Sequence, residues 1–480
     1  MSRPEPPSNS NTLYVRLAND VARLIEAGTL KPGEKLPSVR AMSASRHVSL
    51  STVLQAYYLL EGRGFIRSKP RSGYFVSPHW RGLPLEPAVT TPPRRSTAVN
   101  VSDLVFEVLE ATKRREVVPL GSAFPSPILF PLPRLAQVLC STARNLDPWE
   151  TIESLPPGNY ELRRAIARRY VESGAHVSPE EILITSGAME ALSLCLHTVT
   201  QRGDVVAIES PTFYGALQLV EALDLRAVEI ATHPSEGIDL GALEQAIRKH
   251  AIKACWLMTT FQNPLGSLMP DEKKRELVQL LAKHDIPLIE DDVYSELYFG
   301  ERRPKPAKAY DRAGLVMHCG SYAKCLAPGY RVGWVAPGRY AQAVQRRKTM
   351  TTLSTNVHAQ AALAEYLRHG AYDHHLRQLR GALQQQQTDM LQAIHRHFPQ
   401  GTRISRPQGG YFLWLQLPEG VDALAIHRRA LQKGISIAPG PIFSPQRRHG
   451  NYIRINYGHP WTEVMEQAVA EVGRIAGAMV

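Results

Sequence analysis

One lysine, Lys324, lies in the segment SYAKCLAPGYRVGW (residues 321–334), which carries little other charge. A lysine near a turn is usually a solvated surface residue, because an ammonium group is rarely buried without a partner. A lysine amine is also the group that joins an aldehyde as a Schiff base, and it must then be able to lose its proton. The other residues that the fold brings near Lys324 decide between these interpretations.

Four further side chains would suit a flat, phosphorylated pyridine aldehyde bound at this lysine. A carboxylate such as Asp291 favours the protonated state of a pyridine nitrogen. The Asn263 amide and the Tyr294 hydroxyl are donors for a negatively charged ring oxygen. The Phe213 ring offers a face for stacking. Each residue alone has an ordinary structural explanation, so it is their joint occurrence that indicates a pyridoxal 5′-phosphate site.

A phosphate group on the same ligand needs cationic and hydrogen-bonding partners. The glycine turn in SGAMEAL (residues 186–192) opens a helix whose first backbone N–H groups can hold an anion. The anion-binding groups that the sequence offers are Arg331, the Ser321 hydroxyl and the backbone N–H groups of Gly187, Ala188 and Met189.

Short apolar runs must position these residues. The runs alternate with amphipathic helical stripes from about residue 118 onward: EILIT, DVVAIE, KACWLM, IPLIE and LVMHCG. This alternation predicts an α/β fold with a mainly parallel sheet. Each candidate group follows one of the runs, and such sheets bind ligands beyond the carboxyl ends of their strands. The sequence therefore predicts one shared site.

The first 80 residues have a different pattern. An apolar stripe over residues 13–27 predicts a helix, Ser38 and Ser49 are candidate caps of two more, and FIRSKPRSGYFV (residues 65–76) predicts a β-hairpin. Three short helices and a basic hairpin are typical of a winged helix-turn-helix, whose third helix enters the major groove of DNA. Its expected outward side chains include Ser51, Thr52 and Gln55.

Residues 12–76 resemble the GntR family of DNA-binding domains through LYVRLANDVARLIEAGTLKPGEKLPSVRAM, VSLSTVLQAYYLLEGRGFI and SGYFV, in that order. The resemblance implies that Arg40, Thr52 and Gly73 contact double-stranded operator DNA. One departure is Leu50, where relatives often carry a basic residue. A leucine cannot donate to guanine or phosphate, although it can contact a thymine methyl group.

Composition adds limits on the function. The chain has 480 residues and a net charge of +12, and residues 1–80 hold eleven lysines and arginines against five acidic residues. This excess favours a nucleic-acid partner. Five scattered cysteines without a C-x-x-C pair indicate a reducing compartment, with neither a disulfide framework nor a metal site. The sequence shows no membrane-spanning segment, so we expect a cytoplasmic protein with no membrane partner.

Residues from about 118 to the end resemble fold-type I pyridoxal-phosphate enzymes of the aspartate aminotransferase class. The resemblance rests on SGAMEAL, ESPTFYG, FQNPLG, IEDDVYSELYF, SYAKCLAPGYRVGW, GGYFLWL, APGPIFS and NYIRINYG. It implies that Lys324 is the catalytic lysine bonded to the cofactor, that the other residues act as described above, and that Arg454 binds a substrate or effector carboxylate. Among the departures, Ala323 and Met189 lack the polar side chains that many relatives place on the phosphate.

The expected domains are a winged helix at 12–80, a proline-rich linker at 81–117 and an aminotransferase-like body at 118–480, with a small α+β subdomain from about 360. This layout resembles the MocR-type regulators. The resemblance implies a homodimer and a DNA-binding transcriptional regulator that binds an amino-compound effector as an external aldimine. Two alternatives stay open: an active aminotransferase with an accessory DNA-binding domain, and a scaffold that senses pyridoxal phosphate itself.

Overall fold

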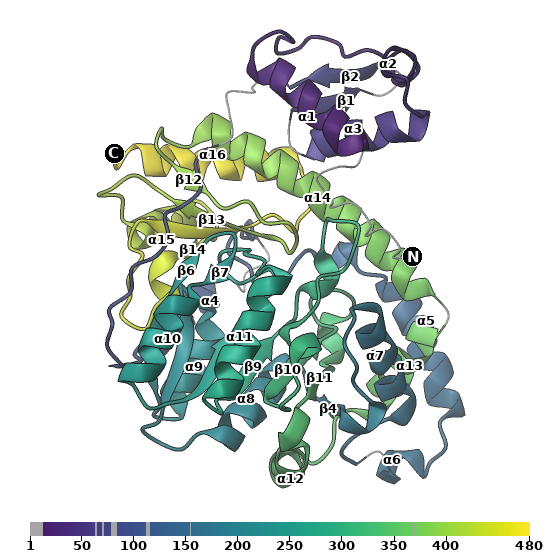
Figure 1. Cartoon of the computed structure of the whole chain (residues 1–480), viewed down its shortest axis with the longest axis vertical. Helices are drawn as coiled ribbons and strands as arrows, with labels where there is room; N and C mark the ends of the chain where they lie inside the picture. The colour runs from purple at the N-terminus through teal and green to yellow at the C-terminus, as the bar shows by residue number, and fades with distance from the viewer. Residues whose placement is uncertain are drawn as a thin grey trace, which may run out of the picture.

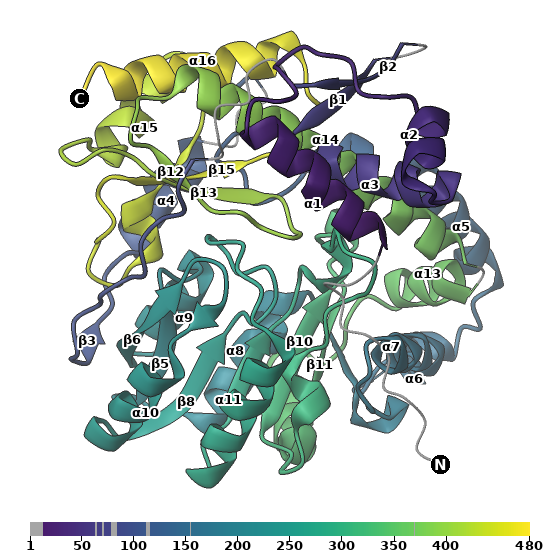
Figure 2. The same ribbon diagram turned by 45° about the horizontal axis from the view of Figure 1, so that its top comes forward.

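The computed structural model describes residues 13–62, 65–69, 72–77, 84–111, 116–153, 155–368 and 370–480. The chain folds into an N-terminal domain that lies on a larger body (Figure 1). The strands of the larger body form two sheets, and helices pack around them (Figure 2).

The N-terminal domain is a winged helix-turn-helix. Its elements are α1 (Leu13–Glu26), α2 (Val39–Arg46), α3 (Leu50–Gly62), β1 (Ile66–Lys69) and β2 (Gly73–Val76). The Ser38 hydroxyl accepts from the Ala41 N–H at 3.2 Å and the Ser49 hydroxyl accepts from the Thr52 N–H at 3.1 Å, so both predicted caps are confirmed. β1 and β2 pair antiparallel, as the hairpin pattern predicts. Residues 70 and 71 of the predicted hairpin lie outside the described residues.

The large sheet has the order β3-β6-β5-β8-β9-β10-β11-β4, and β7 pairs with β6. Its strands are β3 (Thr97–Ala98), β4 (Leu183–Thr185), β5 (Val205–Ser210), β6 (Arg226–His233), β7 (Gly237–Ile238), β8 (Ile252–Leu257), β9 (Leu288–Asp291), β10 (Val316–Ser321) and β11 (Gly333–Ala336). Pairing is parallel from β6 through β5, β8 and β9 to β10, and antiparallel at both ends. The predicted mainly parallel sheet is confirmed.

Helices cover both faces of this sheet because successive strand residues point to opposite sides. Val206 and Ile208 belong to one hydrophobic cluster, which includes residues of α8 and α9, whereas Ala207 belongs to a second cluster with residues of α10 and α11. The helices of the large domain are α5 (Leu132–Asn145), α6 (Glu150–Glu153), α7 (Tyr160–Glu172), α8 (Ala188–Val199), α9 (Tyr214–Ala222), α10 (Leu240–Lys249), α11 (Asp271–Lys283), α12 (Ala341–Thr351) and α13 (Val357–Arg368).

A smaller sheet lies in the C-terminal part, in the order β12-β13-β15-β14 and with antiparallel pairing throughout. Its strands are β12 (Arg403–Ile404), β13 (Phe412–Gln416), β14 (Ala438–Pro439) and β15 (Tyr452–Asn456), and its helices are α14 (Ala371–His397), α15 (Ala423–Gln432) and α16 (Glu463–Gly477). α14 also carries the N-terminal domain, since α3 lies against it (Figure 2).

Residues 84–111 pack along the body. The Leu85 carbonyl accepts from the Ile404 N–H at 2.9 Å, on the small sheet. The Thr90 hydroxyl donates to the Ser210 carbonyl at 2.7 Å, on the large sheet, where β3 pairs with β6. The residues after the prolines form α4 (Ser102–Ala111). This segment therefore has defined contacts with both parts of the body.

Candidate cofactor and DNA-binding sites

Lys324 lies just beyond the end of β10 and faces a cavity of about 160 Å³. Its Nζ donates to the Ala123 carbonyl at 2.8 Å and lies 3.6 Å from the centre of the Phe124 ring. Burial, and then the positive charge of Arg454, lower the pKa of Lys324 to about 7. A large fraction of this amine is therefore neutral near neutral pH, as attack on an aldehyde requires.

Asp291 is the last residue of β9 and pairs with Cys319 on β10, which brings its side chain to the same cavity. Its Oδ1 atom is buried and has no hydrogen-bond partner among the described residues. Burial, and then the neighbouring Asp292 carboxylate, raise the pKa of Asp291 to about 7. An unpartnered buried oxygen of this kind fits a cationic N–H donor on a bound ring.

The part of the site predicted to hold the phosphate contains Gly187, the residue that caps the N-terminus of α8. Gly187 has a φ of +92°, and a Cβ atom there would lie 2.7 Å from Nη2 of Arg331. The Arg331 guanidinium is thus packed directly against the start of the helix. A guanidinium and a helix N-terminus side by side form a corner that favours an anion.

Most of the predicted cofactor residues line this one cavity: Ala188, Met189, Phe213, Asp291, Tyr294, Ser321, Lys324 and Arg331. The Ser321 hydroxyl donates to the Val332 carbonyl at 3.2 Å and accepts from the Ala323 N–H at 3.1 Å. Phe213 is half-buried, and Gly215 allows its close approach, since a Cβ there would lie 2.6 Å from the ring. The structure therefore brings these residues together as the sequence predicts.

Asn263 and Arg454 lie beside the cavity and contact each other. Nη1 of Arg454 donates to Oδ1 of Asn263 at 3.0 Å, so the amide oxygen is engaged and the amide NH₂ group remains to donate. Arg454 is fully buried in β15, 4.1 Å from the centre of the Phe412 ring, and burial lowers its pKa. Buried guanidinium groups of this kind are strong binders of carboxylates.

Sequence reasoning missed three contributors to the site. Ala123 and Phe124 contact Lys324 from a loop 200 residues earlier, and no chemical signal in GSAFP marks them. Glu190, in the first turn of α8, accepts from the Ser186 N–H and forms a buried ion pair with Lys348 at 3.0 Å. That pair ties α12 to the glycine turn that faces Arg331.

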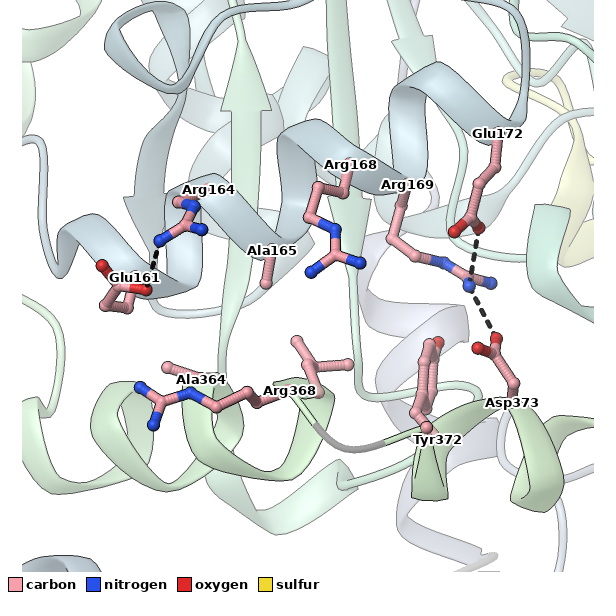
Figure 3. Close-up of a pocket in the computed structure, with 12 residues that line it drawn as sticks. Glu161, Arg164, Ala165, Arg168, Arg169, Glu172, Ala364, Arg368, Tyr372 and Asp373 are labelled. Carbon is pink, nitrogen blue, oxygen red and sulfur yellow. Dashed lines mark hydrogen bonds and ion pairs between the residues drawn. The ribbon is translucent and has the colours of Figure 1, made fainter.

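A second groove, of about 470 Å³, lies between α7 and the α13–α14 junction (Figure 3). Arg169 forms ion pairs there with Glu172 and with Asp373, both at 2.7 Å. Arg164 pairs with Glu161 at 3.3 Å. Much of the charge in this groove is thus neutralised internally, which indicates a structural junction between the helices.

The depressed pKa of Lys324 gives a testable pH dependence. Only the neutral amine attacks the aldehyde, so the rate of cofactor loading onto the cofactor-free protein should rise with pH and level off above about pH 7. Stopped-flow absorbance at a fixed excess of pyridoxal phosphate measures this rate. With Nα-acetyl-lysine as the control amine, the rate should keep rising to about pH 10. A protein rate that also rises beyond pH 9 would contradict the prediction.

The surface predicted to bind DNA is exposed. Ser51 and Gln55 are exposed on α3, whereas Thr52 is half-buried and bonded to Ser49. The structure adds Tyr58, 60% exposed, which follows Ser51 and Gln55 at helical spacing. Leu50 is 49% exposed at the start of the same helix. The assignments of all these residues to DNA contacts remain predictions.

Arg40 and Gly73 complete the predicted DNA contacts. Arg40 is exposed on α2 and forms no ion pair with the residues that the structure describes. Gly73 begins β2 with a φ of +96°, a conformation that favours glycine. Both are thus accessible to a ligand, and a local ion pair does not account for Arg40.

Replacing Arg40 with alanine should weaken operator binding most at low salt. If Arg40 neutralises one phosphate, the slope of log affinity against log salt should fall by about 0.9. Fluorescence anisotropy at several salt concentrations measures the slope. Arg248→Ala on α10, which removes an exposed arginine paired with Glu244, should leave it unchanged. An unchanged slope for Arg40→Ala would exclude a phosphate contact.

Fold and site together define a pyridoxal-phosphate-binding body of the aminotransferase kind joined to a winged helix. Residues 147–472 match the family described as aminotransferase class I and II, and residues 13–76 match the bacterial regulatory proteins of the gntR family. No helix in the described ranges has the length and apolar character needed to span a membrane.

Whole-chain relatives share this architecture. The uncharacterised HTH-type transcriptional regulator YdcR of Escherichia coli is 47% identical over 96% of this chain and 98% of its own length. The 2-aminoadipate transaminase of Thermus thermophilus is 32% identical over 77% of this chain and 92% of its own. The structure of the α-aminoadipate aminotransferase LysN from Thermus thermophilus, complexed with N-(5′-phosphopyridoxyl)-L-leucine, matches with a TM-score of 0.71 at 30% identity, over 78% of this chain and 94% of that one.

The chain belongs to the aminotransferase class I and II family and, with its GntR domain, is a MocR-type transcriptional regulator. Its cofactor is pyridoxal 5′-phosphate. The residues present fit this cofactor: Lys324 would supply the amine, Asp291 the partner of the ring nitrogen, and Arg331 with the start of α8 the anion site. When bound, pyridoxal phosphate withdraws electrons from an amine attached to its aldehyde carbon.

Proposed function

We propose that this regulator binds an amino compound at Lys324 and that this binding changes how the winged helix is held over operator DNA. The observation that carries the proposal is the buried Oδ1 atom of Asp291, which has no hydrogen-bond partner among the described residues. It lines the same cavity as Lys324, whose pKa is lowered, and as Arg331, which packs against the start of α8. Such a set of groups is costly to bury unless a ligand uses it. The effector must have different affinities for the two arrangements of the domains.

The packed segment after the winged helix supports this coupling. Residues 84–88 are bonded to the small sheet, since Arg406 donates to the Pro84 carbonyl at 2.8 Å and Gln416 accepts from the Ala88 N–H. Thr90, two residues on, is bonded to the large sheet. A shift between the two sheets would therefore change the strain on a segment that leads directly to the DNA-binding domain.

We also propose a homodimer that reads two half-sites of operator DNA. Two segments, residues 149–156 and 345–353, are joined by a hydrogen bond from Gln345 to the Pro156 carbonyl. Together they expose the large apolar side chains of Trp149, Ile152, Leu155, Met350 and Leu353. Exposed apolar patches of this kind favour a protein partner, and a second copy would cover them. Because DNA is the proposed partner, we place the protein in the cytoplasm.

The test is the visible absorption spectrum of the cofactor-loaded protein, recorded before and after addition of single amino acids and amines. The regulator hypothesis expects a band that Lys324→Ala lacks, a lasting shift with one class of amine, and a parallel change in operator affinity. A wild-type protein without a Lys324-dependent band would overturn the site. A response of the spectrum without any change in DNA binding would overturn the coupling.

An active aminotransferase is the second candidate, because Lys324, Asp291 and Arg454 are all in place and a transaminase is among the relatives. Steady turnover of an amino acid and an oxo acid at ordinary enzyme rates would favour it. A scaffold that senses the cofactor is the third candidate. DNA binding that responds to pyridoxal phosphate and to no amine would favour that one.

A further inference from the structure

The four residues Gly121–Phe124, here called the strap, lie across the ligand side of the site. The Ala123 carbonyl accepts from Nζ of Lys324 at 2.8 Å and from the Tyr411 hydroxyl at 3.1 Å. Nδ2 of Asn456 donates to the carbonyls of Ser122, at 3.0 Å, and of Phe124, at 2.7 Å. The backbone oxygens of the strap thus accept hydrogen bonds from three separate parts of the body: the loop after β10, the residue before β13, and β15.

The contacts of the strap with Arg454 matter most, because they occupy the N–H groups that a carboxylate would bind. Its Nη2 donates to the Gly121 carbonyl at 2.8 Å and to the Ser122 carbonyl at 3.2 Å, while Nη1 donates to Asn263. A guanidinium has five N–H groups in a planar fork, and a carboxylate binds it bidentately along either the Nη1–Nη2 edge or the Nη2–Nε edge. Both edges need a proton on Nη2, and Nη2 already donates to two carbonyls of the strap.

The protons that remain free cannot replace them. Nε of Arg454 is buried and has no partner among the described residues. Its proton lies on the Nη2–Nε edge, and the guanidinium is also hydrogen-bonded to the Tyr214 side chain. No single carboxylate can therefore bind Arg454 bidentately while Gly121 and Ser122 both keep their contacts. One carbonyl has to leave, and the Ser122 contact is the longer of the two.

The strap is built to move in its middle. Gly121 is buried and held in place, since a Cβ there would lie 2.6 Å from the backbone of Ile437. At the other end Ser126 is buried, and its N–H donates to the Gly458 carbonyl at 2.7 Å. Between these ends Ser122 is only half-buried and Phe124 is 39% exposed. The Ser122 carbonyl keeps the Asn456 donor when Arg454 leaves it, so this short segment with fixed ends and an exposed middle can shift without unfolding its neighbours.

We infer that Gly121–Phe124 is a displaceable strap: a carboxylate on the effector takes the Nη2 proton of Arg454 that the Ser122 carbonyl holds, and the strap moves as a result. This inference rests on the proposed function, since it concerns the same ligand site. It makes the carboxylate the part of the effector that triggers the change. An amine without a carboxylate reaches Lys324 but leaves the strap on Arg454.

Hydrogen–deuterium exchange on the cofactor-loaded wild-type protein tests the strap directly. Matched pairs of probes are used, each an amino acid and the amine that lacks its carboxylate, with acetate as a carboxylate that has no amine. Movement of the strap should break the bonds that the Ser122 amide makes to the Pro119 carbonyl and the Phe124 amide makes to the Ser122 hydroxyl. Amino acids and acetate should therefore raise exchange at these two amides by about tenfold, the effect of losing roughly one hydrogen bond. The matched amines should leave it unchanged, and Arg454→Lys, which keeps the charge but loses the fork, should abolish the rise.

The outcomes separate this inference from the proposed function. An amino acid that shifts the visible spectrum while exchange in the strap stays constant overturns the inference and leaves the function standing. If no amine shifts the spectrum, the proposed function fails, and the acetate titration still decides whether carboxylates displace the strap. Should Arg454→Lys not fold, the comparison of each amino acid with its matched amine on the wild-type protein gives the same decision.

Discussion

Replacing Asp291 with asparagine should stabilise the cofactor-free protein and weaken its binding of pyridoxal phosphate. The two effects have opposite signs because the carboxylate is a poor structural residue and a good partner for a cationic ring. Loss of one partner from a buried ion pair typically costs about 3–5 kcal/mol, so we expect the cofactor dissociation constant to rise by roughly two to four orders of magnitude.

The sign of the stability effect follows from the raised pKa of Asp291, about 7 in the folded protein against an ordinary value of 3.8. Between these values the folded state holds a proton that the unfolded state has released, so stability falls as the pH rises through this window. Above pH 7 the cost is fully present and amounts to at most about 4 kcal/mol. Asparagine removes it, so the gain should be largest at pH 7 and above and absent below about pH 4.

Thermal unfolding of the cofactor-free protein at several pH values and cofactor titration followed by fluorescence measure the two effects. Asp224→Asn is a suitable control, because Asp224 is exposed and its φ of +50° suits asparagine. The control should change neither quantity. If Asp291→Asn destabilised the protein and left cofactor binding intact, Asp291 would be a structural residue and the assignment to the ring nitrogen would be wrong.

The parts of the site that follow strands could be predicted from the sequence. Asp291 ends β9 and Lys324 follows β10, and in a parallel sheet these ends meet at one edge. Hydrophobic periodicity locates the strands, so the meeting of these side chains follows from chain order alone. The same reasoning located the helix caps Ser38 and Ser49, since a cap depends only on local residues.

The parts that depend on backbone atoms or on distant packing could not be predicted. The carbonyls of Gly121, Ser122 and Ala123 contact Arg454 and Lys324, but every residue has a carbonyl, so no residue type marks them. The proline-rich segment was expected to be a linker, and it packs on the body through contacts such as the hydrogen bond of Thr90 and the pairing of β3 with β6. Composition gives the stiffness of such a segment and says nothing of the surface on which it lies.

Replacing Gly187 with alanine should weaken pyridoxal phosphate binding by roughly 10- to 100-fold, the effect of losing one or two hydrogen bonds to a charged group. Two causes act together. The φ of +92° disfavours any side chain, and the new Cβ would lie 2.7 Å from Nη2 of Arg331, so the guanidinium has to leave the anion corner.

Gly203→Ala separates these two causes, because Gly203 has a similar φ of +86° and nothing within 4 Å of the position of its Cβ. Both variants should lose about 1–3 kcal/mol of stability from backbone strain, and only Gly187→Ala should lose cofactor affinity. Inorganic phosphate, which competes for the same corner, should protect Arg331 in the wild type and not in Gly187→Ala, as dicarbonyl labelling followed by mass spectrometry would show. If the two variants bound the cofactor equally well, backbone strain alone would explain the effect of Gly187→Ala on affinity. The phosphate would then be held at another place than the corner formed by Gly187 and Arg331.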